Sequence, residues 1–275
     1  MLPGTAITGH RQTAWPVVLA VLGCLLGFAP ATPAQPAYSF TNCLRQADAA
    51  VRRGDLPGAL QIYAQTQKAE ATNAPHLCAL TKCYCDLMHA CTNGAPPPEL
   101  AQGALTAALQ AIQADPLSVT GHLCVAICYA KNFPFVDVRT KVAYSRGIKL
   151  AAEKALALDP RQDIAYYLLG RWHTGVANLG FFARELVKVV YGGLPRASNA
   201  DAIACFQKAI ALAPNRIIHH AGLFRAYAAA GDPARARQEL ETCRRLKPLD
   251  QDDVDAQKFA LAALASWPHP IPDSL

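Results

Sequence analysis

The sequence predicts an all-α solenoid of about five helical hairpins, with helical insertions between some of them. One observation is composition: the 275 residues are 52% hydrophobic and 17% charged, which supplies a large core and excludes wholesale disorder. The other is a pattern of small and apolar residues that recurs along the chain and ends in most copies at a proline. Such recurrence is the signature of stacked helical repeats. The net charge of +6 is too modest for a nucleic-acid-binding surface.

Residues 1–34 are predicted to be a signal peptide that lies outside the fold. Residues 15–28 carry no charge, and small residues follow them. A short apolar core with a small-residue exit is typical of a secretory signal, and cleavage after Ala31 or Ala34 fits this pattern. We therefore expect export to the periplasm or the medium. The alternative is a cytoplasmic protein, or one anchored in a membrane through residues 15–30, although the apolar run is shorter than the ~20 residues of a spanning helix.

The remaining chain divides into a linker over residues 35–40, one helical repeat domain over residues 41–260 and a proline-rich tail over residues 261–275. The second helix of each hairpin carries small or apolar residues at spacings of four and three, which place them on one face. A proline then ends the helix because it cannot donate a backbone hydrogen bond. The copies are Ala104, Ala108, Ala111 and Pro116; Ile148, Ala152, Ala155 and Pro160; Ala202, Phe206, Ala209 and Pro214; Ala236, Leu240, Cys243 and Pro248; and, without the proline, Ala59, Tyr63 and Thr66.

A partner helix precedes each of these second helices. Its pattern has three positions. An apolar residue comes first, a second residue follows it directly, and an aromatic residue or histidine lies three positions after the second. The copies are Leu80-Thr81-Tyr84, Val125-Ala126-Tyr129, Leu169-Gly170-His173 and Leu223-Phe224-Tyr227. Since the middle residue is mostly small, we expect Gly170 at a close helix crossing and Leu169 in the core. Gly54 and Gly231, each followed by aspartate, mark the turns between paired helices.

These residues resemble the tetratricopeptide repeat, a 34-residue helix–turn–helix unit with small residues where its helices cross. The likeness is good over residues 216–248, fair over 41–71 and interrupted by insertions between them. Residues 157–160, 168–173, 176–179 and 191–195 are similar to the regulator of microtubule dynamics family and its bacterial relatives, a resemblance that covers roughly residues 41–258. It implies a tetratricopeptide-like helical fold, association with microtubules in the animal members, and no catalytic motif.

The longest insertion, residues 174–201, contains a predicted amphipathic helix. Its apolar side chains recur at spacings of about three and four: Phe181, Phe182, Leu186, Val189 and Val190. Gly192-Gly193 ends this helix and Pro195 prevents its return. We expect the apolar face to be buried beside Trp172. The alternative is that the helix closes one end of a groove and shapes a partner site.

The predicted functional site is the concave groove that the first helices of such an array line. Repeat phase places Asp48, Lys82, Ile127, Arg171 and Arg225 in the groove, with Lys131 and Tyr167 beside them. This set suits a protein or peptide partner, in particular an acidic peptide or a terminal carboxylate, because guanidinium groups bind carboxylates in bidentate pairs. The alternative is that Arg171 forms an ion pair within the array. Microtubules are a partner only by the family resemblance, and no small-molecule substrate is evident.

No catalytic or cofactor-binding motif stands out. The sequence lacks Gly-x-Ser-x-Gly, a glycine-rich phosphate loop and His-Glu-x-x-His, so we predict a non-enzymatic protein without a cofactor. An exported enzyme with an unrecognised site is the remaining alternative. His219 and His220 point about 100° apart on a helix, which favours a structural role over metal binding, and we expect His173 at a helix interface. Asp252, Asp253 and Asp255 indicate a helix start.

Nine cysteines remain once residues 1–34 are removed: Cys43, Cys78, Cys83, Cys85, Cys91, Cys124, Cys128, Cys205 and Cys243. Cys78 and Cys85 share a helix face, whereas Cys83 and Cys85 point to opposite sides. Packing thiols are favoured, with disulfides and a metal site as alternatives. Cys124 and Cys128 could reach Cys83 or Cys85, and the pairing stays open.

Overall fold

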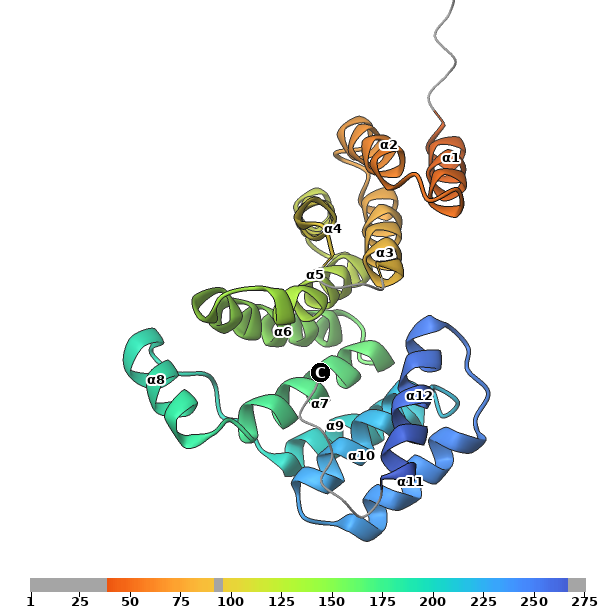
Figure 1. Ribbon diagram of the computed structural model, residues 1–275. Coiled ribbons are helices and arrows are strands. Elements are labelled where there is room, and N and C mark those ends of the chain that lie inside the picture. Colours follow the sequence, from red (N-terminus) through yellow and green to blue (C-terminus); the bar gives the residue numbers. More distant parts are fainter. Residues whose placement is uncertain (1–38, 92–95, 267–275) are drawn as a thin grey trace, which may run out of the picture. The chain divides into compact units, whose positions relative to one another are not determined.

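A computed structural model describes residues 39–91 and 96–266, and all of the described regular structure is helical (Figure 1). The predicted signal peptide and most of the predicted linker lie outside the described residues. No helix within the described ranges is long and apolar enough to cross a membrane.

Ten of the helices pair into five consecutive hairpins, which confirms the predicted architecture. The first helices contact one another in chain order, so the hairpins stack as repeats (Figure 1). The hairpins are α1 (Phe40–Arg52) with α2 (Leu56–Ala69), α3 (Ala74–Ala90) with α4 (Pro98–Ala114), α5 (Val119–Asn132) with α6 (Val138–Leu158), α7 (Asp163–Ala177) with α9 (Asn199–Leu212), and α10 (Ile217–Ala229) with α11 (Pro233–Arg245). A short 3₁₀ turn, Phe133–Phe135, links α5 to α6.

Two further helices complete the described fold. Helix α8 (Phe181–Tyr191) is inserted between α7 and α9, and α12 (Gln251–Ala265) follows the last hairpin and packs on α10 and α11. Ala260 and Ala263 of α12 are buried. The helical domain therefore continues to Ala265, five residues beyond the predicted boundary at 260.

Local sequence sets the helix ends. A side chain accepts a backbone N–H at the start of seven helices, namely Asp55, Asn73, Ser118, Asp137, Ser198, Asp232 and Asp250. Helices α4, α6, α9 and α11 all end two or three residues before the predicted stop prolines. Gly54 and Gly231 adopt φ of +76° and +77° between paired helices, a left-handed conformation that only glycine adopts without strain.

The predicted helix faces form the core. Ala104, Ala108 and Ala111 of α4 are fully buried, as are the matching residues of α9 and α11. Leu169 is also buried, and a Cβ atom on Gly170 would lie 2.8 Å from the Phe206 ring of α9. The absent side chain is therefore what lets α7 approach α9 this closely, as the repeat phase predicts.

The insertion helix forms as predicted, but the expectation that its apolar face is buried is wrong. Phe181, Phe182 and Val189 are 72%, 87% and 79% exposed, and Val187 is the buried side chain of the helix. Polar contacts hold α8 in place instead: Arg146 of α6 donates to the carbonyl oxygens of Tyr191 and Gly193. Trp172 is buried, and its indole N–H donates to Ser145 of α6 at 3.0 Å. The polar group of Trp172 is therefore satisfied by α6 rather than by α8.

Candidate functional site

The structure brings together three of the seven residues predicted in or beside the groove, Tyr167 and Arg171 of α7 and Arg225 of α10; we call these the arginine cluster. The Arg171 guanidinium lies 5.8 Å from the centre of the Tyr167 ring. Arg225 lies 4.1 Å from the ring centre of Phe259, which α12 contributes. Aromatic faces attract guanidinium groups, so each arginine is held by a ring while its N–H edges stay available.

The two arginines repel each other. Burial lowers the pKa of the Arg225 guanidinium, the nearby positive charge of Arg171 lowers it further, and Tyr167 opposes both effects. Throughout the described ranges, no carboxylate forms an ion pair with either arginine. The predicted alternative, an ion pair of Arg171 within the array, does not occur there. A bound anion would relieve the repulsion, because an opposite charge stabilises the charged form of both groups.

The two predicted lysines differ from the arginines because each already has an acidic partner. Lys82 Nζ lies 2.5 Å from Asp86 on the same helix, and Lys131 Nζ lies 3.3 Å from Asp252 of α12. Of the other two positions that the repeat phase selects, Asp48 is exposed and Ile127 is half-buried. The arginine cluster is therefore the part of the predicted groove whose charge is not balanced.

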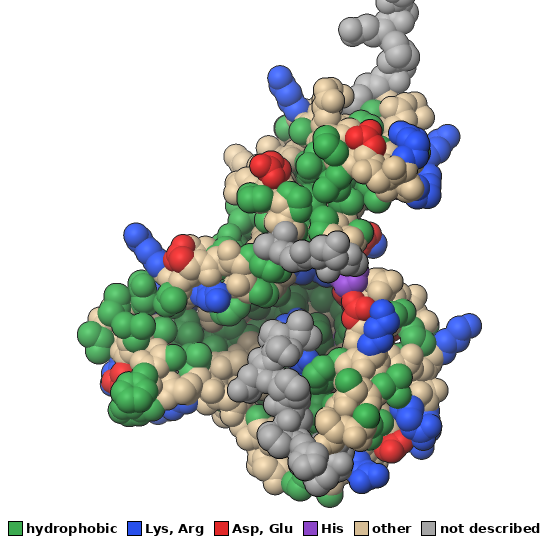
Figure 2. Space-filling model, viewed as in Figure 1, with side chains coloured by type: hydrophobic (Ala, Val, Ile, Leu, Met, Phe, Trp, Pro, Cys, Tyr) green, Lys and Arg blue, Asp and Glu red, His purple; other side chains and the backbone are tan. Residues whose placement is uncertain are grey.

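Helix α12 contributes side chains that repeat phase could not identify. Phe259 lies against Arg225, Asp252 pairs with Lys131 of α5, and Asp255 lies 2.8 Å from His89 of α3. Its acidic residues do start the helix, as predicted, with Asp250 as N-cap. Figure 2 shows a hollow between α5–α6 and α12 with Lys or Arg side chains visible inside it. The helix after the last hairpin thus contacts two of the predicted groove residues, Lys131 and Arg225.

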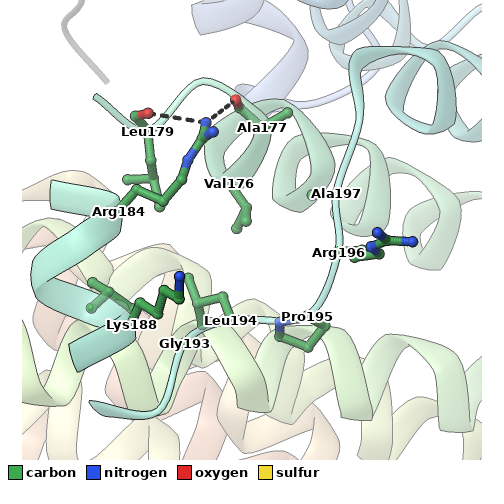
Figure 3. Close-up of a pocket in the computed structure, with 11 residues that line it drawn as sticks. Val176, Ala177, Leu179, Arg184, Lys188, Gly193, Leu194, Pro195, Arg196 and Ala197 are labelled. Atoms are coloured by element: carbon green, nitrogen blue, oxygen red, sulfur yellow. Dashed lines mark hydrogen bonds between the residues drawn. The ribbon is translucent and has the colours of Figure 1, made fainter. Parts of the chain in front are cut away.

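A separate cavity of about 320 Å³ lies beside α8, between the end of α7 and residues 193–197. In Figure 3, Arg184 reaches across it and donates to the carbonyl oxygens of Ala177 and Leu179, at 2.9 and 3.2 Å. The Lys188 side chain extends into the cavity, whereas Arg196 points away from it (Figure 3). No acidic residue is among its lining residues. The sequence offered no signal for this cavity, because it depends on how α8 and the following loop fold back.

The histidines bridge helices, as their predicted structural role requires. His219 Nε2 lies 2.8 Å from Asp163 at the start of α7, and this hydrogen bond lowers the pKa of Asp163. His220 bonds Glu239 of α11 at 2.7 Å and the Pro214 carbonyl oxygen at 3.0 Å. His173 is half-buried, and burial lowers its pKa. Among the described residues, no three potential ligands converge as a metal site.

The His220–Glu239 pair predicts a pH-dependent stability. Burial lowers the pKa of His220, but the hydrogen bonds to Glu239 and to the Pro214 carbonyl, together with the Glu239 charge, raise it by more, so the net pKa is raised. The raised pKa contributes stability that is fully present below the unfolded-state value of about 6.5 and is lost as pH rises through the folded-state value. Glu239→Gln should therefore destabilise most at acidic pH, by roughly 1.5–3 kcal/mol for a charged hydrogen bond.

Urea denaturation of both proteins from pH 5.5 to 8.5 measures this difference. The two proteins share every other ionisable group, so the effects of those groups cancel in the difference. A difference in the free energy of unfolding that stays constant across this pH range would contradict the role of Glu239 in raising the His220 pKa.

Comparison with known proteins identifies the family. The model of the family Regulator of microtubule dynamics protein 1-3 matches residues 43–267. Regulator of microtubule dynamics protein 1 of Bos taurus is 27% identical over 181 residues, which cover 65% of this chain and 56% of the bovine protein. Regulator of microtubule dynamics protein 3 of Xenopus laevis is 26% identical over 182 residues, covering 64% and 38% of the two chains. The chain thus spans about half the length of the mammalian relatives that it matches.

Solved structures show the fold independently of the family. A thermophilic TPR protein from Thermus thermophilus superposes with a TM-score of 0.54 at 17% identity, over 82% of this chain and 100% of that one. This likeness shows a tetratricopeptide-like helical repeat and nothing finer. Since the family model matches most of the chain, the protein belongs to the Regulator of microtubule dynamics protein 1-3 family.

Proposed function

We propose that this protein is a non-catalytic helical-repeat scaffold that binds an acidic protein or peptide partner on the face of its first helices, with the arginine cluster at the centre. A tetratricopeptide-like array fits this role because stacked repeats present an extended concave surface. The observation that carries the proposal is the pair Arg171 and Arg225, which repel each other and have no acidic partner among the described residues.

The chemistry of the cluster favours a carboxylate. A guanidinium presents N–H donors in a planar fork that matches both oxygens of one carboxylate. Arg171 is exposed, and Arg225 is half-buried against Phe259. Desolvation strengthens such a contact, because charges interact more strongly where water is excluded. An aspartate or glutamate side chain, or a terminal carboxylate of the partner, would offset the repulsion between the two arginines.

Charge reversal at Arg171 should weaken this binding. The probe is a fluorescein-labelled hexaglutamate peptide with a free C-terminal carboxylate, measured by fluorescence anisotropy. Loss of one charged hydrogen-bonding contact, about 1.5–3 kcal/mol, corresponds to an affinity roughly 10- to 100-fold weaker for Arg171→Glu.

Arg237→Glu is the matched control. Arg237 is exposed on the second helix α11, and its reversal changes the net charge by the same amount. This control should bind the peptide as the parent does. Equal weakening by both variants would reduce the effect to net charge and contradict a site at the cluster.

Family membership supports a second candidate, regulation of microtubule dynamics, which the names of the bovine and frog relatives state of those proteins. This function requires a chain that meets tubulin inside the cell. The predicted signal over residues 1–34 supports export instead. N-terminal sequencing of the native protein separates the two: a chain that begins at Thr32 or Gln35 supports export, and a cytosolic chain that begins at Met1 supports the microtubule function.

A further inference from the structure

Two pairs of thiols meet in register between the first helices α3 and α5. The side chains of Cys78 and Cys124 act on each other's pKa across this interface, and so do those of Cys85 and Cys128. Cys124 Sγ also lies 3.9 Å from the carbonyl oxygen of Cys78. All four thiols are buried, at most 9% exposed. The members of each pair therefore face each other across packed helices, the arrangement from which a disulfide between α3 and α5 can form.

We propose that Cys78–Cys124 and Cys85–Cys128 are a redox site that forms two disulfides between α3 and α5 when the chain folds in the presence of a disulfide oxidant. This inference goes beyond partner binding, because it concerns how two neighbouring repeats are joined. It also settles on one pairing among the nine cysteines of residues 35–275, which the sequence leaves open.

Three of the other cysteines have contacts of a different kind. Cys83 lies on the other side of α3, where burial and the charge of Asp48 raise its pKa and where it contributes to the raised pKa of Tyr63. Cys91 and Cys243 donate to backbone carbonyl oxygens rather than to thiols. A metal site is not the explanation, since no three ligands converge among the described residues.

In both pairs the cysteine on α3 has a lowered pKa and the cysteine on α5 has a raised pKa. The hydrogen bond from Cys124 lowers the pKa of the Cys78 thiol, and the same contact raises the pKa of Cys124. The hydrogen bond from Cys128 lowers the pKa of Cys85 in the same way, and that of Cys128 is raised. In the closed interface the more acidic thiol of each pair therefore lies on α3.

Exchange with a glutathione disulfide balances the reaction. The Cys78 thiolate attacks one sulfur, the glutathione S–S bond breaks, and the released glutathione thiolate takes up the proton that Cys78 lost. Cys124 then loses its proton and attacks Cys78 Sγ, which forms the protein disulfide and releases the second glutathione as a thiol. Two electrons pass from the protein pair to one glutathione disulfide. Since glutathione cannot enter the buried interface, this exchange takes place before α3 and α5 close.

Refolding tests the proposal on the full chain. The reduced, denatured protein is refolded in a buffer of reduced and oxidised glutathione, alkylated, and digested with trypsin and a protease that cleaves after Asp and Glu. Trypsin alone leaves residues 83–131 as one peptide, so the second cleavage is required. We expect peptides 71–82 and 83–86 each to be linked to peptide 100–131, which carries Cys124 and Cys128.

Single variants assign the two bonds. Cys124→Ser should release peptide 71–82 alone, Cys128→Ser should release peptide 83–86 alone, and Cys83→Ser should keep both links. If a serine variant fails to fold, tandem mass spectrometry of the parent's linked peptides still assigns the bonds. Complete alkylation of all thiols in the refolded parent, or links through Cys83 or Cys91, would overturn the proposal.

Discussion

Replacing Phe206 by alanine is expected to lower the free energy of unfolding by about 3–5 kcal/mol, which is the usual cost of truncating a fully buried aromatic side chain. The Phe206 ring of α9 is 0% exposed and lies against two glycines, Gly170 of α7 and Gly222 of α10. It also packs edge-on against Tyr167, with ring centres 6.0 Å apart. Because one ring fills the space between three helices, its removal leaves a cavity that no single helix can close.

Thermal melts followed by circular dichroism measure this effect. A domain of this size loses roughly 2–4 °C of melting temperature per kcal/mol, so Phe206→Ala should melt on the order of 10 °C below the parent. Phe182→Ala is the matched control, since Phe182 is 87% exposed and surface substitutions change stability by about 0.5 kcal/mol or less. Equal losses for the two variants would contradict both the core position of Phe206 and the exposure of α8.

Asp253→Ala is the second substitution with a large expected cost. The Asp253 carboxylate is 0% exposed and accepts the backbone N–H groups of Ile218 at 3.1 Å and Leu249 at 3.2 Å. Arg216 Nε lies 3.5 Å away. Helix α10 has no side-chain N-cap of its own. Asp253 of α12 instead accepts the Ile218 backbone N–H in the first turn of α10. Removal leaves two backbone donors unpaired, at about 1–3 kcal/mol each, and leaves Arg216 with Asp250 as its remaining carboxylate, at 2.8 Å.

Asp252→Ala is the matched control in the same helical turn. The Asp252 side chain is 52% exposed and pairs with Lys131 at 3.3 Å, an arrangement that contributes about 1 kcal/mol or less. In urea denaturation, the free energy of unfolding of Asp252→Ala should therefore be close to that of the parent. That of Asp253→Ala should lie well below both. An Asp253→Ala protein as stable as the Asp252 variant would show that α12 does not cap α10.

The hairpins were predictable because their signals are local. Spacings of four and three mark a buried face, as they do at Ala202, Phe206 and Ala209, and a proline marks the end of each second helix after the first hairpin. The small residue at Gly170 likewise indicated a close crossing. Such features depend on neighbours a few positions away, so one sequence is enough to identify them.

What the sequence could not show depends on contacts between distant segments. Helical periodicity located α8 correctly, but periodicity alone does not say whether a partner covers an apolar face. The contacts of α12 with Lys131 and Arg225 depend on how successive repeats rotate. The Cys78–Cys124 pair joins residues 46 positions apart. The helical phase alone left Cys83 and Cys85 as equal candidates for contact with the cysteines of α5.

Site-specific photo-cross-linking tests most directly the claim that the face of the first helices binds a protein partner. Gly175 lies one turn beyond Arg171 on the same face of α7, and an added side chain there meets no atom within 4 Å. A photoreactive phenylalanine analogue is placed at position 175, or at position 237 on α11, in cells that produce the protein. We expect one dominant cross-linked polypeptide from position 175, lost when Arg171→Glu is added, and none from position 237. Cross-links from position 237 with none from position 175 would contradict it.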